Sequence, residues 1–268
     1  MLFGDRLVVI RGGGDLASGV VHQLHRAGFP VVVLELERPL AIRRTVSFAT
    51  AIDEGSFVIE GVKAVRASTP DAAVRLAADG TVAALVSPSL PTFTPVPSVV
   101  VDARIAKRNI DTTVDQAPLV VALGPGFEAG SDCDVVIETR RGHRLGRVIR
   151  KGSAQPDTGI PGEVGGRTDE RLIRAPDVGI VNWGISIGDM VETGQILGTV
   201  GTTSVGAAVA GVARGLISPG YEVSKGLKIG DIDPRGDRSA CFEISDKARL
   251  VGAGVLGAVL EWLNVEAA

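Results

Sequence analysis

A glycine-rich turn near the N-terminus constrains this chain more than any other feature. Its sequence is RGGGD, residues 11–15, and it stands between an apolar run, residues 7–10, and a helical pattern that ends at Gly28. The spacing Gly12-x-Gly14-x-x-Ala17 fits the fingerprint of phosphate-binding βα units, in which the second glycine admits a phosphate. The sequence therefore predicts nucleotide or phosphate binding here. The alternative is a turn that only packs a strand against a helix.

An acidic residue about 20 positions after the glycines normally holds a ribose hydroxyl in such units. The next apolar strand, residues 31–34, runs into Glu35-Leu36-Glu37, and Glu35 lies 35 − 14 = 21 residues beyond Gly14. Side chains alternate along a strand, so Glu35 and Glu37 share a face and either can serve. Asp15 argues against a dinucleotide, because its carboxylate at the helix N-terminus can cap the free N–H groups and repel a phosphate.

Apolar strands alternate with helical segments through the first 150 residues, which predicts a parallel sheet. A Thr69-Pro70 pair predicts the start of a helix that continues through Ala78. Ligands bind beyond the carboxyl ends of parallel strands, where this chain gathers glycine, arginine and histidine. The predicted cofactor-binding residues are Gly12, Gly13, Gly14, Asp15, Glu37, Arg104, Gly124, Gly126, Arg140 and Arg141. His143 is the catalytic candidate for proton transfer, with an ordinary loop histidine as the alternative.

The second part of the chain contains an internal repeat. After a loop-rich connection that includes Gly152, Gly159 and Pro161-Gly162, the segments GDMVETGQILG and GYEVSKGLKIG begin at Gly188 and Gly220, an offset of 220 − 188 = 32. Two such β-rich half-units resemble the barrel-sandwich hybrid of biotinyl and lipoyl carrier domains. No lysine occurs from residue 152 to 224, which excludes the usual covalent attachment. We therefore expect a rigid binding or assembly module.

The expected fold is α/β, with three parts. A Rossmann-like parallel sheet domain over residues 1–150 precedes a small β-rich, barrel-sandwich-hybrid-like domain over residues 151–236. A C-terminal helical segment, residues 237–268, is expected to pack back on the first domain. Lys247 and Arg249 stand in the first turn of this helix, where they oppose the helix dipole, so they indicate either neutral surface or an anion site.

Composition excludes several functions. A net charge of −3 without a run of basic residues argues against nucleic-acid binding, and the late apolar run, residues 251–260, is too short to span a bilayer. The two cysteines, Cys133 and Cys241, suggest a reducing cytoplasm and match no metal motif. Asp132 and Asp134 are expected to raise the pKa of Cys133, which argues against catalysis by this thiol.

Taken together, the sequence motifs identify a family resemblance that runs from end to end. The segments that carry it are VIRGGGDLASGV, IRRTVSF, VDARIAKRNIDT, ALGPGF, VIETRRGHRLGRVI, TGIPGEVGG, RLIRAP, KIGDIDPRG and ISDKARLVGAGVL. The chain resembles the YqeB-type proteins of selenium-dependent molybdenum hydroxylase systems. The N-terminal half is also similar to xanthine dehydrogenase accessory factors, which handle the molybdenum cofactor. The resemblance implies a cytosolic accessory protein encoded alongside molybdenum hydroxylases.

Three functions remain open at this point. The first is a maturation protein that binds molybdopterin, or its nucleotide form, at the edge of the sheet and presents it to a hydroxylase apoenzyme. The second is an NAD(P)-dependent oxidoreductase, and the third is a non-catalytic assembly scaffold. The expected partners are that apoenzyme and a small phosphorylated ligand, without nucleic acid, membrane or metal. The sequence leaves homo-oligomer formation and catalytic activity open.

Overall fold

The computed structural model describes residues 1–157, 159 and 163–266, and it divides the chain into two compact units. Unit 1 comprises Met1–Pro39, Ser47–Asp157 and Ile244–Ala268, and unit 2 comprises Leu40–Val46 and Thr158–Glu243. Pro161 and Gly162, which the sequence places in the loop-rich connection, lie outside the described residues. Each unit has its own hydrophobic core.

Unit 1 is built on a nine-stranded sheet in the order β3-β4-β5-β2-β1-β6-β7-β8-β9. The seven central strands are parallel to their neighbours: β4 (Val62–Ala67), β5 (Val82–Val86), β2 (Val31–Glu35), β1 (Val8–Arg11), β6 (Val99–Asp102), β7 (Leu119–Leu123) and β8 (Val135–Ile137). The two edge strands, β3 (Ser56–Ile59) and β9 (Val148–Ile149), run antiparallel. The sheet is therefore mixed.

The predicted Rossmann-like parallel sheet is thus wrong, and a hairpin shows why. Strands β3 and β4 are joined by Glu60 and Gly61, which both have positive φ angles, +45° and +79°. Such turns close two-residue antiparallel hairpins. The Glu-Gly pair is a weaker hairpin signal than Asn-Gly, and β9 has only two residues, so the sequence indicated neither antiparallel edge.

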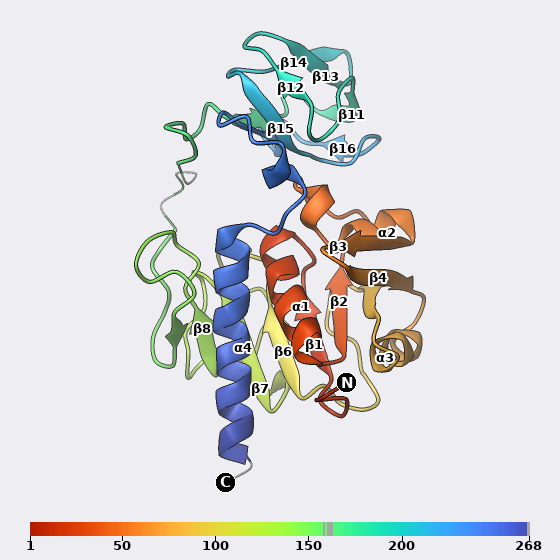
Figure 1. Ribbon diagram of the computed structural model, residues 1–268, viewed down its shortest axis with the longest axis vertical. Helices are drawn as coiled ribbons and strands as arrows, with labels where there is room; N and C mark the ends of the chain where they lie inside the picture. Colours follow the sequence, from red (N-terminus) through yellow and green to blue (C-terminus); the bar gives the residue numbers. More distant parts are fainter. Residues whose placement is uncertain (158, 160–162, 267–268) are drawn as a thin grey trace. The chain divides into compact units, whose positions relative to one another are not determined.

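Helices cover both faces of the sheet. Three of them, α1 (Asp15–Ala27), α2 (Thr50–Glu54) and α4 (Asp246–Glu266), share one core with one face of the central strands. The other face packs against α3 (Pro70–Ala78), which the Thr69 hydroxyl caps by accepting the N–H of Ala72. Figure 1 shows α1 and α4 side by side. Short 3₁₀ turns, η1 (Arg44–Val46), η2 (Val114–Gln116) and η3 (Ser239–Cys241), complete the helical segments.

Glycines bring α1 and α4 into close contact. A Cβ atom on Gly19 would lie 2.1 Å from the carbonyl oxygen of Ala248, and one on Gly252 would lie 2.4 Å from the carbonyl oxygen of Gly19. The same side of α4 buries Val251 and Val255. By length and composition α4 could cross a membrane, but the core helix of a soluble protein meets the same criterion, and α4 packs here as a core helix.

Unit 2 contains two four-stranded antiparallel sheets, in the orders β10-β17-β15-β12 and β14-β13-β11-β16. Their strands are β10 (Leu172–Arg174), β11 (Gly179–Trp183), β12 (Met190–Val191), β13 (Ile196–Val200), β14 (Thr203–Gly206), β15 (Gly211–Leu216), β16 (Glu222–Val223) and β17 (Lys228–Asp233). The expected barrel-sandwich-hybrid layout is wrong. The 32-residue repeat identifies equivalent segments, but it does not determine strand pairing, and equivalent strands such as β12 and β16 lie in different sheets.

A segment from the N-terminal half of the chain also belongs to unit 2. The carbonyl oxygen of Ile42 accepts a hydrogen bond from the N–H of Leu216 at 2.7 Å, and the Arg43 guanidinium donates to the carbonyl oxygen of Ala240. The sequence did not indicate that this segment belongs to unit 2, because residues 40–46 carry no distinctive periodicity.

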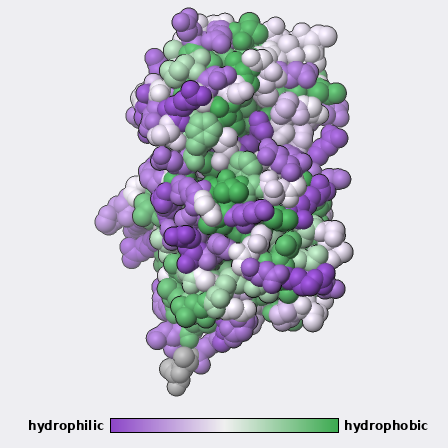
Figure 2. Space-filling view, turned by 45° about the vertical axis from the view of Figure 1, so that its right-hand side comes forward, coloured by the Kyte–Doolittle hydropathy of each residue, from purple (hydrophilic) through white to green (hydrophobic). Residues whose placement is uncertain are grey.

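On the surface, hydrophobic residues are interspersed with hydrophilic ones over the face that Figure 2 shows.

Candidate functional site

The three glycines of the turn between β1 and α1 have different roles. Gly12 has a φ of +97°, and a Cβ there would lie 3.0 Å from the carbonyl oxygen of Ala103. A Cβ on Gly13 would lie 2.9 Å from the backbone nitrogen of Ala49. Gly14 has an ordinary φ of −66°, and a Cβ there would meet nothing within 4 Å. The fold therefore requires the first two glycines, but it does not require the third.

Gly14 is also the N-cap of α1, and it has no side chain to cap the helix. The N–H groups of the first helical turn have no acceptor within the helix, and together with the helix dipole they attract anions. Asp15, the first helical residue, places a carboxylate at the same end. The open space at Gly14 thus lies beside both donors and a negative charge.

The structure decides between the two acidic residues at the end of β2, Glu35 and Glu37. The Gly13 N–H donates to Glu35 Oε2 at 2.7 Å, and the Leu36 N–H donates to Glu35 Oε1 at 2.8 Å. Burial raises the pKa of the Glu35 carboxyl, although these two hydrogen bonds lower it in part. Glu37, the predicted residue, is exposed. Glu35 therefore holds the glycine turn and occupies one of its N–H groups.

An arginine–aspartate network, which the sequence analysis missed except for Arg104, lies where β1 and β6 end. Arg11 donates through one guanidinium nitrogen to both carboxylate oxygens of Asp111, at 2.7 and 2.8 Å. Arg104 contacts Asp102 at 2.5 Å and Asp111 at 2.7 Å, and the Thr112 hydroxyl donates to Asp102 at 2.6 Å. The Arg104 fork is thus already engaged by two carboxylates, so a phosphate would have to compete with them.

The charges of this network stabilise each other. Burial alone would raise the pKa of Asp111, but hydrogen bonds from Arg11 and Arg104 outweigh it and lower that pKa below its ordinary value. Arg104 responds in the opposite sense: burial would lower its pKa, whereas Asp102 and Asp111 raise it. Asp111 and Arg104 therefore each favour the charged form of the other.

Gly124 and Gly126 follow β7 and shape the adjoining loops. Their φ angles are +76° and +101°. A Cβ on Gly124 would lie 2.6 Å from the Thr139 hydroxyl oxygen, and one on Gly126 would lie 2.4 Å from the backbone nitrogen of Arg108. Both conformation and close packing explain these glycines. Neither glycine therefore needs a bound ligand to explain its presence.

The predicted basic residues after β8 lie in an exposed turn. Arg140 and His143 are exposed, and Arg141 forms a two-pronged ion pair with Asp246 of α4 at 2.7 and 3.0 Å. The turn is anchored by the buried Glu138, whose carboxylate accepts the Arg140 N–H at 2.7 Å. Among the residues that the structure describes, Arg141 is therefore the only one of these three whose side chain forms an ion pair.

Lys247, in the first turn of α4, interacts electrostatically with Asp15 at the start of α1. Burial lowers the pKa of its ammonium, which Asp15 and Glu138 raise and Arg141 lowers. Within the described part of the chain, this ammonium has no ion pair shorter than 4.0 Å. Arg249, its neighbour in the sequence analysis, instead forms an ion pair with Glu60 at 2.9 Å. Lys247 thus adds a positive charge to the group around the start of α1.

The two thiols are poor nucleophiles. Burial, reinforced by Asp132 and Asp134, raises the pKa of Cys133 to about 12, which confirms the prediction for this residue. Cys241 is also buried, and burial raises its pKa. No group of three or more His, Cys, Asp or Glu residues that could hold a metal ion occurs among the residues described by the structure. Neither thiol offers a reactive group, so the candidate site is the set of residues described above at the start of α1, namely Gly14, Asp15 and Lys247.

Comparisons with known proteins give one relative by sequence. No family model matches the chain. The uncharacterized protein YqeB of Escherichia coli K12 is 47% identical over 258 residues, which are 96% of this chain and 48% of that protein. The chain thus spans about half the length of its curated relative.

Solved structures give only distant similarities. An aspartoacylase family protein from Mesorhizobium loti shares 14% identity over 85% of this chain and 84% of its own, with a TM-score of 0.30. A succinylglutamate desuccinylase/aspartoacylase from Rhodobacter sphaeroides shares 15% identity over the same proportions, with a TM-score of 0.28. These scores are too low to support an argument about the site.

Proposed function

Because the chain belongs to the YqeB-type family, we propose that it is an accessory protein for molybdenum hydroxylase maturation that binds a phosphorylated pterin or nucleotide. The proposed ligand is molybdopterin or its nucleotide form, and the proposed partner is a hydroxylase apoenzyme. Two unpaired cysteines support a cytoplasmic location. The link to molybdenum hydroxylases, including the selenium-dependent ones, comes from the family resemblance, and the site supplies the binding chemistry.

Gly14 is the observation that carries the binding proposal. Neither its φ angle nor its packing requires a glycine, yet it stands at the uncapped N-terminus of α1 with open space in front of it. A side chain at this position would obstruct a phosphate approaching the helix N–H groups. Close approach of a ligand is the remaining physical reason for a glycine in a phosphate-binding βα unit.

Lys247 supplies the charge that a bound phosphate needs. Asp15 repels an anion at this helix end, and the Gly13 N–H is already taken by Glu35. The Lys247 ammonium offsets that repulsion, and a phosphate next to it would raise its lowered pKa. In this proposal the helix N–H groups orient the phosphate, and Lys247 neutralises it. No bond is made or broken in the site.

Native mass spectrometry distinguishes the three functions. The protein is purified from a host that makes molybdopterin and from an isogenic host that does not. We expect an additional mass, released on denaturation as a pterin phosphate, only from the first host. Retained NAD(P) would instead support an oxidoreductase. Absence of any small molecule from both preparations would contradict cofactor binding and leave the assembly scaffold.

A pair of glycine variants tests the site itself. Gly14→Asp adds a second carboxylate to the helix end without backbone strain, so pterin retention is expected to fall at least about tenfold in a folded protein. Gly257→Asp is the matched control, because a Cβ on this α4 glycine also meets nothing within 4 Å. Circular dichroism checks that both variants fold. Equal retention in the two variants would exclude Gly14 from the site.

A further inference from the structure

A second site emerges from a pocket of about 500 Å³ beside edge strand β9 in unit 1. Its apolar wall includes Val148 and Ile149, which form β9 itself. Its basic wall consists of Arg144, Arg147 and Lys151, none of which the sequence analysis singled out. Pockets of 300–1,000 Å³ with an apolar surface and a few polar groups are typical of small-molecule sites.

Backbone hydrogen bonds fix the walls of this pocket. The buried carboxylate of Glu138 accepts the N–H of Gln155 at 2.8 Å through one oxygen and the N–H of Arg140 through the other. The carbonyl oxygen of Gly152 accepts the N–H of Ala129 at 2.9 Å. Residues 152–155 are therefore held in place next to β9. A ligand would not have to order this segment, which lowers the entropic cost of binding.

The charge of the pocket is not balanced by the protein. Three cations face one carboxylate, and the oxygens of that carboxylate, on Glu138, already accept backbone N–H groups. Basic residues nearby in unit 1 do have partners: Arg141 pairs with Asp246, Arg150 with Glu261 and Lys107 with Asp157. Arg144, Arg147 and Lys151 have no ion pair within 4.0 Å among the residues that the structure describes. Cations gathered in a concave site attract anions.

We propose that this pocket binds a small phosphorylated compound. Its phosphate lies among Arg144, Arg147 and Lys151, and its organic part packs against Val148 and Ile149. Arginine forks match phosphate oxygens in two-pronged geometry, and lysine adds a point charge. The apolar wall favours an organic phosphate over the inorganic ion, because burial of apolar surface adds affinity.

The pocket is distinct from the site at Gly14. Strands β1 and β8 are three positions apart in the sheet, a separation of roughly 14 Å at the usual strand spacing. A phosphate at Gly14 therefore cannot contact the cations beside β9, although Lys247 of the Gly14 site interacts electrostatically with Glu138 of the pocket. The pocket proposal therefore does not depend on the proposed function, and either can fail alone.

Calorimetric titration tests the pocket, with inorganic phosphate and adenosine monophosphate as the probes. We expect Arg147→Ala and Lys151→Ala each to weaken both probes about 10- to 100-fold. The matched controls are Arg75→Ala and Lys63→Ala, which remove exposed cations of unit 1 that do not line the pocket. Gly14→Asp should leave the affinity of the pocket unchanged.

Each outcome bears on the proposal. Losses confined to the two pocket variants would support it. Equal losses in pocket and control variants would show general charge attraction and would overturn it, as would no detectable binding of either probe to the wild type. A loss with Gly14→Asp alone would assign the bound anion to the turn before α1 instead. If adenosine monophosphate binds no more tightly than inorganic phosphate, the role of Val148 and Ile149 is refuted.

Discussion

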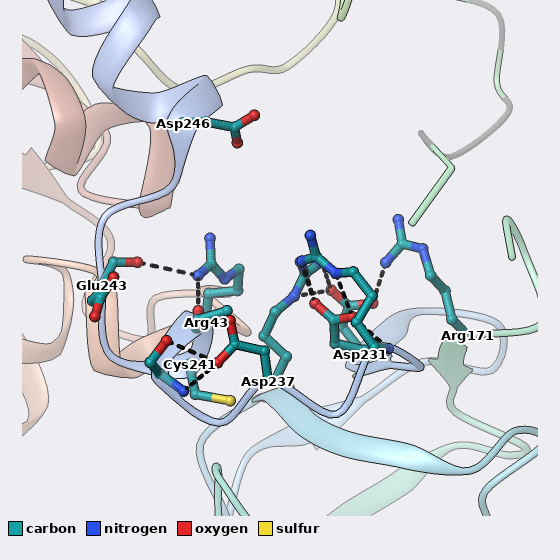
Figure 3. A network of polar contacts seen from close by, with 12 residues as sticks. Arg43, Arg171, Asp231, Asp237, Cys241, Glu243 and Asp246 are labelled. Atoms are coloured by element: carbon teal, nitrogen blue, oxygen red, sulfur yellow. Dashed lines mark hydrogen bonds and ion pairs between the residues drawn. The ribbon is translucent and has the colours of Figure 1, made fainter. Parts of the chain in front are cut away.

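Both units contain an arginine–aspartate network, but the two networks differ in their exposure to water. In unit 2, Asp231 accepts from Arg171 and Arg214, as Figure 3 shows in part, and the Asp231 side chain is 2% exposed. In unit 1, Asp111 pairs with Arg11 and Arg104, but its side chain is 43% exposed. Arginine–aspartate ion pairs thus occur at a buried aspartate in unit 2 and at a half-exposed aspartate in unit 1.

Strand pairing explains this difference. Asp231 lies on β17 and has a paired strand on each side, opposite Leu172 of β10 and Gly215 of β15, so the neighbouring strands cover it. Arg11 and Asp102 stand at the carboxyl ends of parallel strands, and Asp111 comes from the loop that follows. Residues at strand ends face the crevice where ligands bind in open α/β sheets. The unit 1 network therefore stands at strand ends that no further strand covers, whereas the unit 2 network lies within its sheet.

The largest expected effect comes from breaking the sealed network. Asp231→Ala leaves the guanidinium groups of Arg171 and Arg214 buried without this carboxylate, so we expect unit 2 to lose about 3–5 kcal/mol of unfolding free energy. The measurement is urea denaturation followed by Trp183 fluorescence in a Trp262→Phe background, because Trp183 belongs to unit 2 and Trp262 to unit 1.

Arg235→Ala is the matched control for this experiment. Arg235 pairs with Asp233 in the same network, but its side chain is 52% exposed. Exposed ion pairs contribute about 0–1 kcal/mol, so this variant should remain within that range of the wild type. Equal destabilisation by the two variants would contradict the difference between buried and exposed positions.

The open network should respond less. Asp111→Ala removes the carboxylate that pairs with the buried Arg11, and we expect unit 1 to lose about 2 kcal/mol, since water at the half-exposed position replaces part of the interaction. Trp262 fluorescence in a Trp183→Phe background reports this loss.

The effect of Asp111 also has a defined pH dependence. Its pKa in the folded protein is lowered, so its contribution is present above the unfolded pKa of 3.8 and is lost as the pH falls through the folded value. Wild type and Asp111→Ala should therefore converge in stability in strong acid. A difference that stays constant from neutral pH down to that range would show that Asp111 acts through packing rather than charge.

The sequence predicted local features better than tertiary ones. The glycine turn, the helix start at Thr69 and the inert thiol of Cys133 follow from short-range chemistry, and the structure contains all three. The pairing of Arg104 with Asp111 depends on how a loop folds back to its own strand end, which has no periodic signal. The antiparallel edges of the first sheet and the strand pairing of unit 2 were missed for the same reason.

The choice between Glu35 and Glu37 shows where sequence reasoning ends. By the alternation rule both carboxylates share a face, so either could serve, and Glu37 was the predicted site residue, but β2 ends at Glu35. Only the approach of the Gly13 N–H to 2.7 Å selects Glu35. A backbone donor of this kind is not visible in a residue pattern, because every residue except proline has one.

The smallest expected effect concerns Lys247. Among the residues that the structure describes, no aspartate forms an ion pair with it as Asp231 and Asp111 do with their arginines. Burial lowers its pKa below the ordinary 10.5, so the unfolded chain binds more protons than the folded one between the lowered value and 10.5. Unfolding free energy should therefore rise with pH across that interval, by at most about 1.4 kcal/mol per pH unit. Lys247→Met removes this slope, whereas the exposed Lys63→Met should keep it. Urea denaturation of unit 1 at a series of alkaline pH values measures the difference. Identical slopes in the two variants would show that Lys247 is solvated like any surface lysine and is not buried beside Asp15.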